Sequence, residues 1–137
     1  MPEYVVRPVG RVESTLVDRA SAPRQGDEGA PDCTIAVDPE YAPAARDIEP
    51  GAELLVLTWL DRASRDVQSV RPRGEPDRPE TGVFSTRSPD RPNPIGMHRS
   101  KVLTVEGNGW LQVQGLEAID GTPILDIKPV LDRCHEY

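Results

Sequence analysis

Lys101-Val-Leu-Thr-Val-Glu-Gly-Asn-Gly-Trp-Leu-Gln-Val-Gln114 is the stretch of this sequence that decides the fold. Apolar and β-branched residues recur at short intervals on both sides of Gly107-Asn-Gly109, which is typical of strands with one buried face. Glycine and asparagine between two such runs are a strong short-range signal of a β-hairpin. The sequence therefore predicts antiparallel strands at 101–105 and 110–114.

Five further stretches have the length and the flanking turn residues of short strands. They are Tyr4–Val12 (interrupted at Pro8), Cys33–Val37, Leu54–Leu60, Val83–Thr86 and Pro123–Lys128. In residues 39–46 the sequence predicts only a brief helical turn. Residues 61–80 are charged and contain prolines, and they are a candidate flexible lid. Because about seven short strands alternate with turns, we expect an all-β sandwich or barrel.

Composition points to one small domain. The chain has 137 residues, 15 prolines and 11 glycines, and only 4% of it is aromatic, which favours short strands and many turns. Cys33 and Cys134 are far apart and have no metal-ligand spacing, so we expect free thiols and no metal. With no signal peptide and no long apolar run, we expect a cytoplasmic protein that does not enter a membrane.

Charge is distributed unevenly. The net charge of −7 argues against indiscriminate binding to nucleic acid. The segment from Arg62 to Lys101, however, contains nine basic and five acidic residues. Its net charge is therefore +4, and that of the remainder is −11. A basic face on an acidic body suits one defined anionic partner, and the alternative is a solvated, charge-rich loop.

A proline-stiffened loop carries two arginines. Gly82-Val-Phe-Ser-Thr-Arg-Ser-Pro-Asp-Arg-Pro-Asn-Pro-Ile-Gly96 contains three prolines that exclude helix interior and central strand. A rigid loop presents Arg87 and Arg91 at little entropic cost, so we interpret it as part of a binding site.

Two weaker signals lie near the end of the sequence. Asp126 and Lys128 fall on the same face of the last predicted strand, where they form either an exposed ion pair or the lining of a cleft. Asp120-Gly-Thr-Pro123 predicts a tight turn whose glycine permits positive φ or the close approach of a ligand. Nucleotide-binding glycine motifs and metal clusters are absent. His98 and His135 are isolated in the sequence, so a serine triad is not expected.

Four motifs together resemble the TsaA-like (TrmO-type) tRNA methyltransferases. They are the 82–96 loop, Leu116-Glu-Ala-Ile-Asp-Gly-Thr-Pro-Ile-Leu-Asp-Ile-Lys-Pro129, Val9-Gly-Arg-Val-Glu-Ser14 and Ala22-Pro-Arg-Gln-Gly26. The resemblance implies one β-barrel domain over residues 1–137, single-sheeted, with short strands and long loops. It also implies a homodimer that uses S-adenosylmethionine to methylate N6 of threonylcarbamoyladenosine at position 37, in the anticodon loop of tRNA.

The resemblance also implies roles for individual residues. Those similar to the cofactor-binding segments are Pro23, Arg24, Gln25, Arg87, Met97, Asp120, Gly121, Thr122 and Pro123, with Asp61 added by its position at the end of the apolar strand. Those that match positions near the reaction centre are Arg91, Asn93, Asp126 and Lys128, of which Asp126 is the candidate proton acceptor.

Three alternative functions stay open. One is a methyltransferase of the same architecture that acts on a small molecule. Another is a non-catalytic S-adenosylmethionine-binding module, which the replacement of a family aromatic by Val130 permits. The last is a plain β interaction domain, against which the rigid arginine loop argues.

Overall fold

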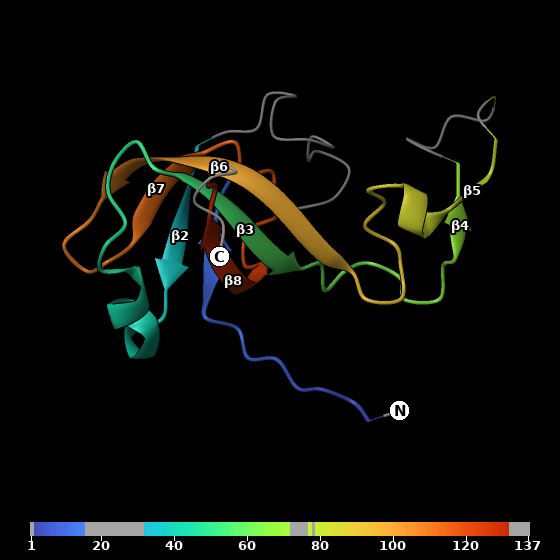
Figure 1. The fold of residues 1–137 in the computed structure, drawn as a ribbon, viewed down its shortest axis with the longest axis horizontal. Helices are drawn as coiled ribbons and strands as arrows, with labels where there is room; N and C mark the ends of the chain where they lie inside the picture. The colour runs from blue at the N-terminus through green and yellow to red at the C-terminus, as the bar shows by residue number, and fades with distance from the viewer. Residues whose placement is uncertain (1, 16–31, 72–76, 78, 132–137) are drawn as a thin grey trace.

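The predicted hairpin forms one side of a closed barrel of six antiparallel strands (Figure 1). The computed structural model describes residues 2–15, 32–71, 77 and 79–131. In barrel order the strands are β1 (Gly10–Glu13), β2 (Cys33–Val37), β7 (Leu111–Gln114), β6 (Ile95–Val105), β3 (Glu53–Trp59) and β8 (Pro123–Pro129). The predicted all-β barrel is confirmed.

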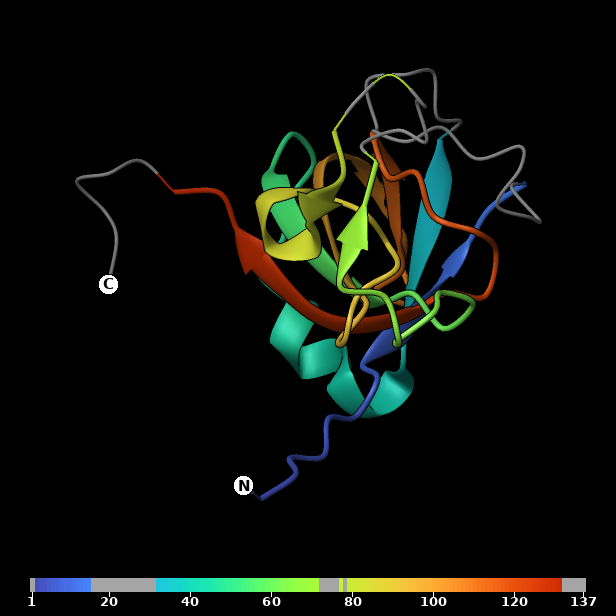
Figure 2. The same cartoon turned by 90° about the vertical axis from the view of Figure 1, so that its right-hand side faces the viewer.

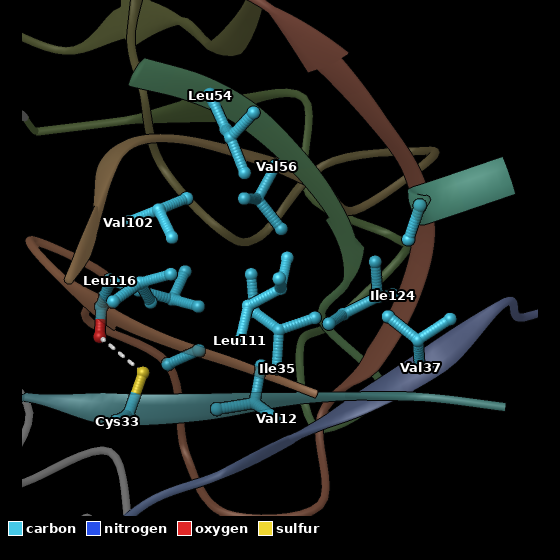
Figure 3. Close-up of a cluster of buried hydrophobic side chains, with 13 residues drawn as sticks. Val12, Cys33, Ile35, Val37, Leu54, Val56, Val102, Leu111, Leu116 and Ile124 are labelled. Carbon is cyan, nitrogen blue, oxygen red and sulfur yellow. Dashed lines mark hydrogen bonds between the residues drawn. The ribbon is translucent and has the colours of Figure 1, made fainter. Parts of the chain in front are cut away.

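Alternation along the strands builds the core. In β3, Leu54, Val56 and Thr58 are buried, while the residues between them face outward. Figure 3 shows side chains from all six strands meeting inside the barrel, among them Ile35 and Leu111. This period of two is why a sequence with few aromatic residues can still fill a small barrel.

Outside the barrel lie a short helical turn and a separate excursion. The turn, η2 (Pro39–Ala45), follows β2 as expected. The excursion comprises residues 61–94, and its described parts hold the two-stranded sheet of β4 (Ser69–Val70) and β5 (Thr81–Gly82) and the 3-10 turn η4 (Val83–Ser85). Figure 2 views the molecule from the side on which the excursion lies.

Three predicted strands differ from the structure, and one of them, β6, begins at Ile95 and not at Lys101. The first begins at Gly10, because the chain before Val9 separates from β8 and Pro8 lacks a backbone donor. Residues 83–85 form a 3-10 turn in place of a strand, with Thr86 N–H donating to the Val83 carbonyl at 3.0 Å.

The connection from β7 to β8 closes one end of the barrel. These two strands stand opposite each other in the barrel order, so residues 115–122 must cross the barrel end to join them. Leu116 and Ala118 bury their side chains in the core as they cross. We call residues 115–122 the plug segment.

Cys33 is buried against the plug segment, and its thiol lies 3.8 Å from the Leu116 carbonyl (Figure 3). Burial, with smaller contributions from Asp32 and Glu117, raises the pKa of this thiol from 9.0 to about 12. Since the folded pKa is the higher one, the stability that this group confers is complete below pH 9 and is lost as the pH rises toward 12.

We therefore expect Cys33 to resist alkylation in the folded protein at pH 8, because the thiolate is the reactive form. A Cys134→Ser variant leaves Cys33 as the single thiol, and mass spectrometry after iodoacetamide treatment measures its modification. The same variant in guanidinium chloride is the control and should react fully. Equal rates in the folded and unfolded states would contradict the prediction.

Candidate functional site

Most of the predicted site residues that the structure describes lie on strands or loops that meet one end of the barrel. There β3 ends at Trp59, opposite the first residue of β6, Ile95. β8 begins beside them, since Thr58 pairs with Ile124. We call this end the rim; the excursion and the Asp120 turn both connect to it.

The Asp120 turn is held in one conformation. Thr122 N–H donates to the Ile119 carbonyl at 3.0 Å, and its hydroxyl donates to the same oxygen at 2.6 Å. Gly121 has a φ of 85°, which the third residue of a type II turn requires. Asp120 Oδ1 accepts the Ser14 N–H at 3.0 Å, and the residue is exposed. The turn therefore presents a fixed carboxylate at the rim.

Arg87 and Arg91 differ in what they contact. Arg87 is exposed, and the described part of the chain offers its side chain no hydrogen bond or ion pair. The Arg91 guanidinium instead turns inward and donates to the carbonyls of Val83 at 2.8 Å and of Thr86 and Ser88 at 3.0 Å. Arg91 thus fixes the loop that exposes Arg87.

Asn93 is part of a second brace. Its Oδ1 accepts a hydrogen bond from Arg65 at 2.8 Å, and Arg65 also donates to the Pro92 carbonyl at 2.7 Å. The Arg65 guanidinium lies 5.2 Å from the centre of the Trp59 ring, a cation–π contact. Arg65 therefore ties the end of the proline loop to the end of β3.

Met97, Asp126 and Lys128 lie on the outer surface of the barrel. Leu57 of β3 pairs with Met97 of β6 on one side and with Asp126 of β8 on the other, so the three form one row. The next row holds Lys128, Leu55 and Arg99. Neighbouring strands lie about 4.8 Å apart, which places Met97 and Asp126 about 10 Å apart at the backbone. We call these two rows the outer wall.

Both oxygens of Asp126 are engaged. Oδ1 accepts the N–H of Ile127 at 2.8 Å, and Oδ2 lies 3.2 Å from Lys128 Nζ. The two charged side chains are 51% and 59% exposed, so the pair expected from the sequence forms as an exposed ion pair. A proton-transfer role for Asp126 would have to compete with these contacts.

Of the remaining predicted cofactor residues, some lie in the described part of the chain and others do not. Asp61 is exposed just past β3, and its N–H donates to the Trp59 carbonyl at 3.0 Å. Pro123 begins β8 beside Arg11. Pro23, Arg24 and Gln25 lie outside the described residues.

A buried polar network escaped the sequence analysis. His98 Nε2 lies 2.7 Å from Thr58 Oγ1, and its Nδ1 lies 2.6 Å from Glu117 Oε1. The order hydroxyl, imidazole and carboxylate resembles a catalytic triad, but Thr58 is fully buried and His98 is 6% exposed, so no substrate reaches it. The alternation of buried and exposed residues along β6 is the pattern that could have placed His98 inside the barrel. No sequence pattern indicates its partner Glu117, which lies 19 residues away.

The network needs Gly96. A Cβ at this position would lie 2.4 Å from Thr58 Oγ1 and 2.8 Å from His98 Nε2, so only glycine lets the imidazole occupy its place. The network joins β3, β6 and the plug segment directly behind the rim.

Metal clusters and membrane-spanning helices are both absent from the described ranges. No group of three or more histidine, cysteine, aspartate or glutamate residues there is arranged to hold a metal ion. In the same ranges, no helix has the length and apolar character needed to span a bilayer.

Comparison with known proteins identifies the family. A family model described as the tRNA-methyltransferase O N-terminal domain matches residues 11–136. The chain belongs to this family. The TrmO-type resemblance is thereby confirmed, and at family level so are the enzyme class, a methyltransferase, and the cofactor, S-adenosylmethionine.

Relatives that match by sequence are named either S-adenosyl-L-methionine-binding proteins or a tRNA methyltransferase. An S-adenosyl-L-methionine-binding protein of Archaeoglobus fulgidus is 45% identical over 124 residues, which is 90% of this chain and 87% of that protein. A probable S-adenosyl-L-methionine-binding protein of Methanothermobacter thermautotrophicus is 44% identical over 93% of this chain and 90% of its own length. The mouse tRNA (adenine(37)-N6)-methyltransferase is 58% identical over 52 residues, 38% of this chain and 12% of the mouse protein.

Solved structures of TrmO share the fold. TrmO of Pseudomonas aeruginosa superposes with a TM-score of 0.74 at 28% identity, and a second TrmO structure with 0.75 at 30%. The chain spans 56% and 58% of these two proteins, which in turn cover 96% and 95% of it. The likeness therefore covers the barrel and leaves the rest of those longer proteins unmatched.

Proposed function

We propose that this chain transfers the methyl group of S-adenosylmethionine to N6 of threonylcarbamoyladenosine at position 37 of tRNA. The observation that carries the proposal is the rim. There an exposed guanidinium, Arg87, and a fixed carboxylate, Asp120, lie on loops that lead into β6 and β8, the two strands that flank β3 in a TrmO-family barrel. The 52-residue match to the mouse enzyme supports tRNA as the substrate.

The chemistry of the rim suits this cofactor. A guanidinium such as that of Arg87 binds a carboxylate strongly, and a carboxylate such as that of Asp120 accepts hydrogen bonds from ribose hydroxyls. The cofactor supplies a methyl group that its sulfonium has already activated. The protein's own contribution is therefore positioning and the exclusion of water, which braced loops provide.

We propose positioning roles for Arg91 and Asn93, because their side chains contact the protein itself. Asp126 and Lys128 stay candidates for contact with the acceptor, on the outer wall below the rim. Apolar Met97 of this wall is 44% exposed, and Ile95, which pairs with Trp59 at the rim, is 47% exposed. We also propose that the protein is cytoplasmic and forms a homodimer that covers Ile95 and Met97, and light scattering tests the mass of the dimer.

The decisive experiment incubates the protein with S-adenosylmethionine and tRNA, digests the tRNA and measures its nucleosides by mass spectrometry. We expect one added methyl group on threonylcarbamoyladenosine. Binding of the cofactor without methylation of any tRNA would favour the second candidate, a non-catalytic binding module. That alternative is supported by the names of the two archaeal relatives and by the engaged carboxylate of Asp126.

An Arg87→Ala variant is expected to bind S-adenosylmethionine about tenfold more weakly. A hydrogen bond to a charged group contributes about 1.5–3 kcal/mol, and Arg87 has no described partner within the protein to lose. Isothermal titration calorimetry measures the affinity. Arg46→Ala is the matched control, because Arg46 is an exposed arginine whose side chain is 77% accessible beside η2. If both variants bind equally well, Arg87 is not part of the cofactor site.

A further inference from the structure

Phe84 is the one phenylalanine of the chain, and its side chain is almost fully in solvent. It lies on η4, is 85% exposed and belongs to the proline-stiffened loop that also carries Arg87. An aromatic ring buries a large apolar area when it binds a partner, so leaving it in water is unfavourable unless a ligand covers it.

The backbone that carries this ring is rigid. Val83, the residue before it, is 3% exposed, and its N–H donates to the Gln68 carbonyl at 2.9 Å. The Val83 carbonyl accepts from both Arg91 and Thr86. The ring is thus presented by fixed backbone, and binding to it costs little conformational entropy.

Phe84 borders a hollow of about 420 Å³ whose other lining residues are Gln68, Gly82, Val83, Ser85 and Pro92. Valine, proline and the ring give apolar walls. The glutamine amide and the serine hydroxyl give hydrogen-bonding groups. This volume lies in the range of small-ligand pockets.

We infer that this hollow is a subsite for one unstacked nucleobase of the RNA substrate, with the base stacked on Phe84. A nucleobase has flat apolar faces and a hydrogen-bonding edge, which is the combination that the lining offers. A protein partner is a poorer fit, because a specific interface needs about 800 Å² from each side and this hollow is lined by six residues. The inference rests on the proposed function and adds where the acceptor strand is held.

The test uses two variants that separate the aromatic ring from simple bulk. Phe84→Leu keeps an apolar side chain without a π-face, and Phe84→Tyr keeps the ring. An anticodon stem-loop with 2-aminopurine in place of the target base reports stacking, because an aromatic ring against the bound base quenches its fluorescence relative to the same base bound without a ring. We expect wild type and Phe84→Tyr to quench it and Phe84→Leu not to.

The kinetic readout should agree. With tRNA as substrate, Phe84→Leu should raise KM about tenfold, since stacking on an aromatic side chain is commonly worth that factor, and its affinity for S-adenosylmethionine should not change. Full quenching and an unchanged KM with Phe84→Leu would overturn the inference. So would weaker cofactor binding or a change in oligomeric mass in that variant, because the ring would then belong to the cofactor site or to a subunit interface.

Failure of the proposed function is distinguishable from failure of this inference. If wild type methylates no tRNA, the proposed function fails, and quenching that depends on the ring still supports a nucleobase subsite. If wild type does not quench the probe, the subsite is overturned whatever the enzyme methylates.

Discussion

Replacing Arg91 by alanine is expected to lower kcat/KM for methyl transfer at least about 100-fold while the barrel stays folded. Its guanidinium donates to the carbonyls of Val83, Thr86 and Ser88, and each hydrogen bond from a charged donor is worth about 1.5–3 kcal/mol. Loss of even two of them should release the loop. Arg87 would then no longer be held in one position.

The measurement combines kinetics with two readouts of structure. Thermal unfolding followed by circular dichroism should change little, because none of these bonds involves the barrel core. Chymotryptic cleavage after Phe84 should become faster as the loop loosens. Arg91→Lys should behave like Arg91→Ala, since a lysine ammonium lacks the planar fork that reaches three carbonyls. An active, protease-resistant Arg91→Ala variant would contradict the bracing role.

Arg87→Ala is the informative comparison for this variant. Arg87 has no described partner within the protein, so its loss should weaken cofactor binding without speeding the cleavage after Phe84. If both arginines gave the same protease pattern, the distinction between a ligand-binding and a positioning arginine would be wrong.

Local pattern was sufficient to predict most of the barrel. The strand at Cys33–Val37 and the turn that follows it agree with the structure, because both depend on neighbouring residues. The same holds for the hairpin, where Gly109 N–H donates to the Glu106 carbonyl at 2.9 Å and Gly109 has a φ of 85°. β-Branched runs and glycine turns express their preferences without help from distant residues.

The errors arose where distant groups decide the local conformation. Residues 83–86 have the composition of a strand, but Arg91 binds the Val83 carbonyl and helps to hold a 3-10 turn. β6 begins at Ile95, directly after Pro94, six residues earlier than the sequence predicted. Its pairing with the whole length of β3 explains that extension.

The site shows the same limit more strongly. The motifs placed Arg91, Asn93 and Asp126 near the reaction, and they gave no sign that each side chain already has a partner in the protein. Those partners follow from loop geometry and strand register, which a single sequence does not reveal. The pairing of His98 with Glu117 is hidden for the same reason.

Glu117→Ala is expected to lower the free energy of unfolding by about 1–3 kcal/mol, the usual cost of leaving a buried hydrogen-bonding group without its partner. The Glu117 side chain is 12% exposed and that of His98 5%, so His98 Nδ1 would lose its partner in a dry environment. Urea unfolding measures the loss. Glu13→Ala is the matched control, since the Arg11–Glu13 pair has a similar length, 2.9 Å, but is 49% and 40% exposed and should contribute less than about 1 kcal/mol.

A triple substitution separates the network from its surroundings. Replacing His98 and Glu117 by leucine and Thr58 by valine removes the three polar side chains together, and replacing all partners of a buried polar contact by apolar groups is often nearly neutral, so the triple variant should be more stable than Glu117→Ala. Equal losses for Glu13→Ala and Glu117→Ala would show that the buried pair has no special weight. Since Glu117 lies three residues before Asp120 in the plug segment, we also expect Glu117→Ala to weaken cofactor binding when assayed well below its unfolding temperature. The barrel interior would then set the position of the rim, through a network that no substrate touches.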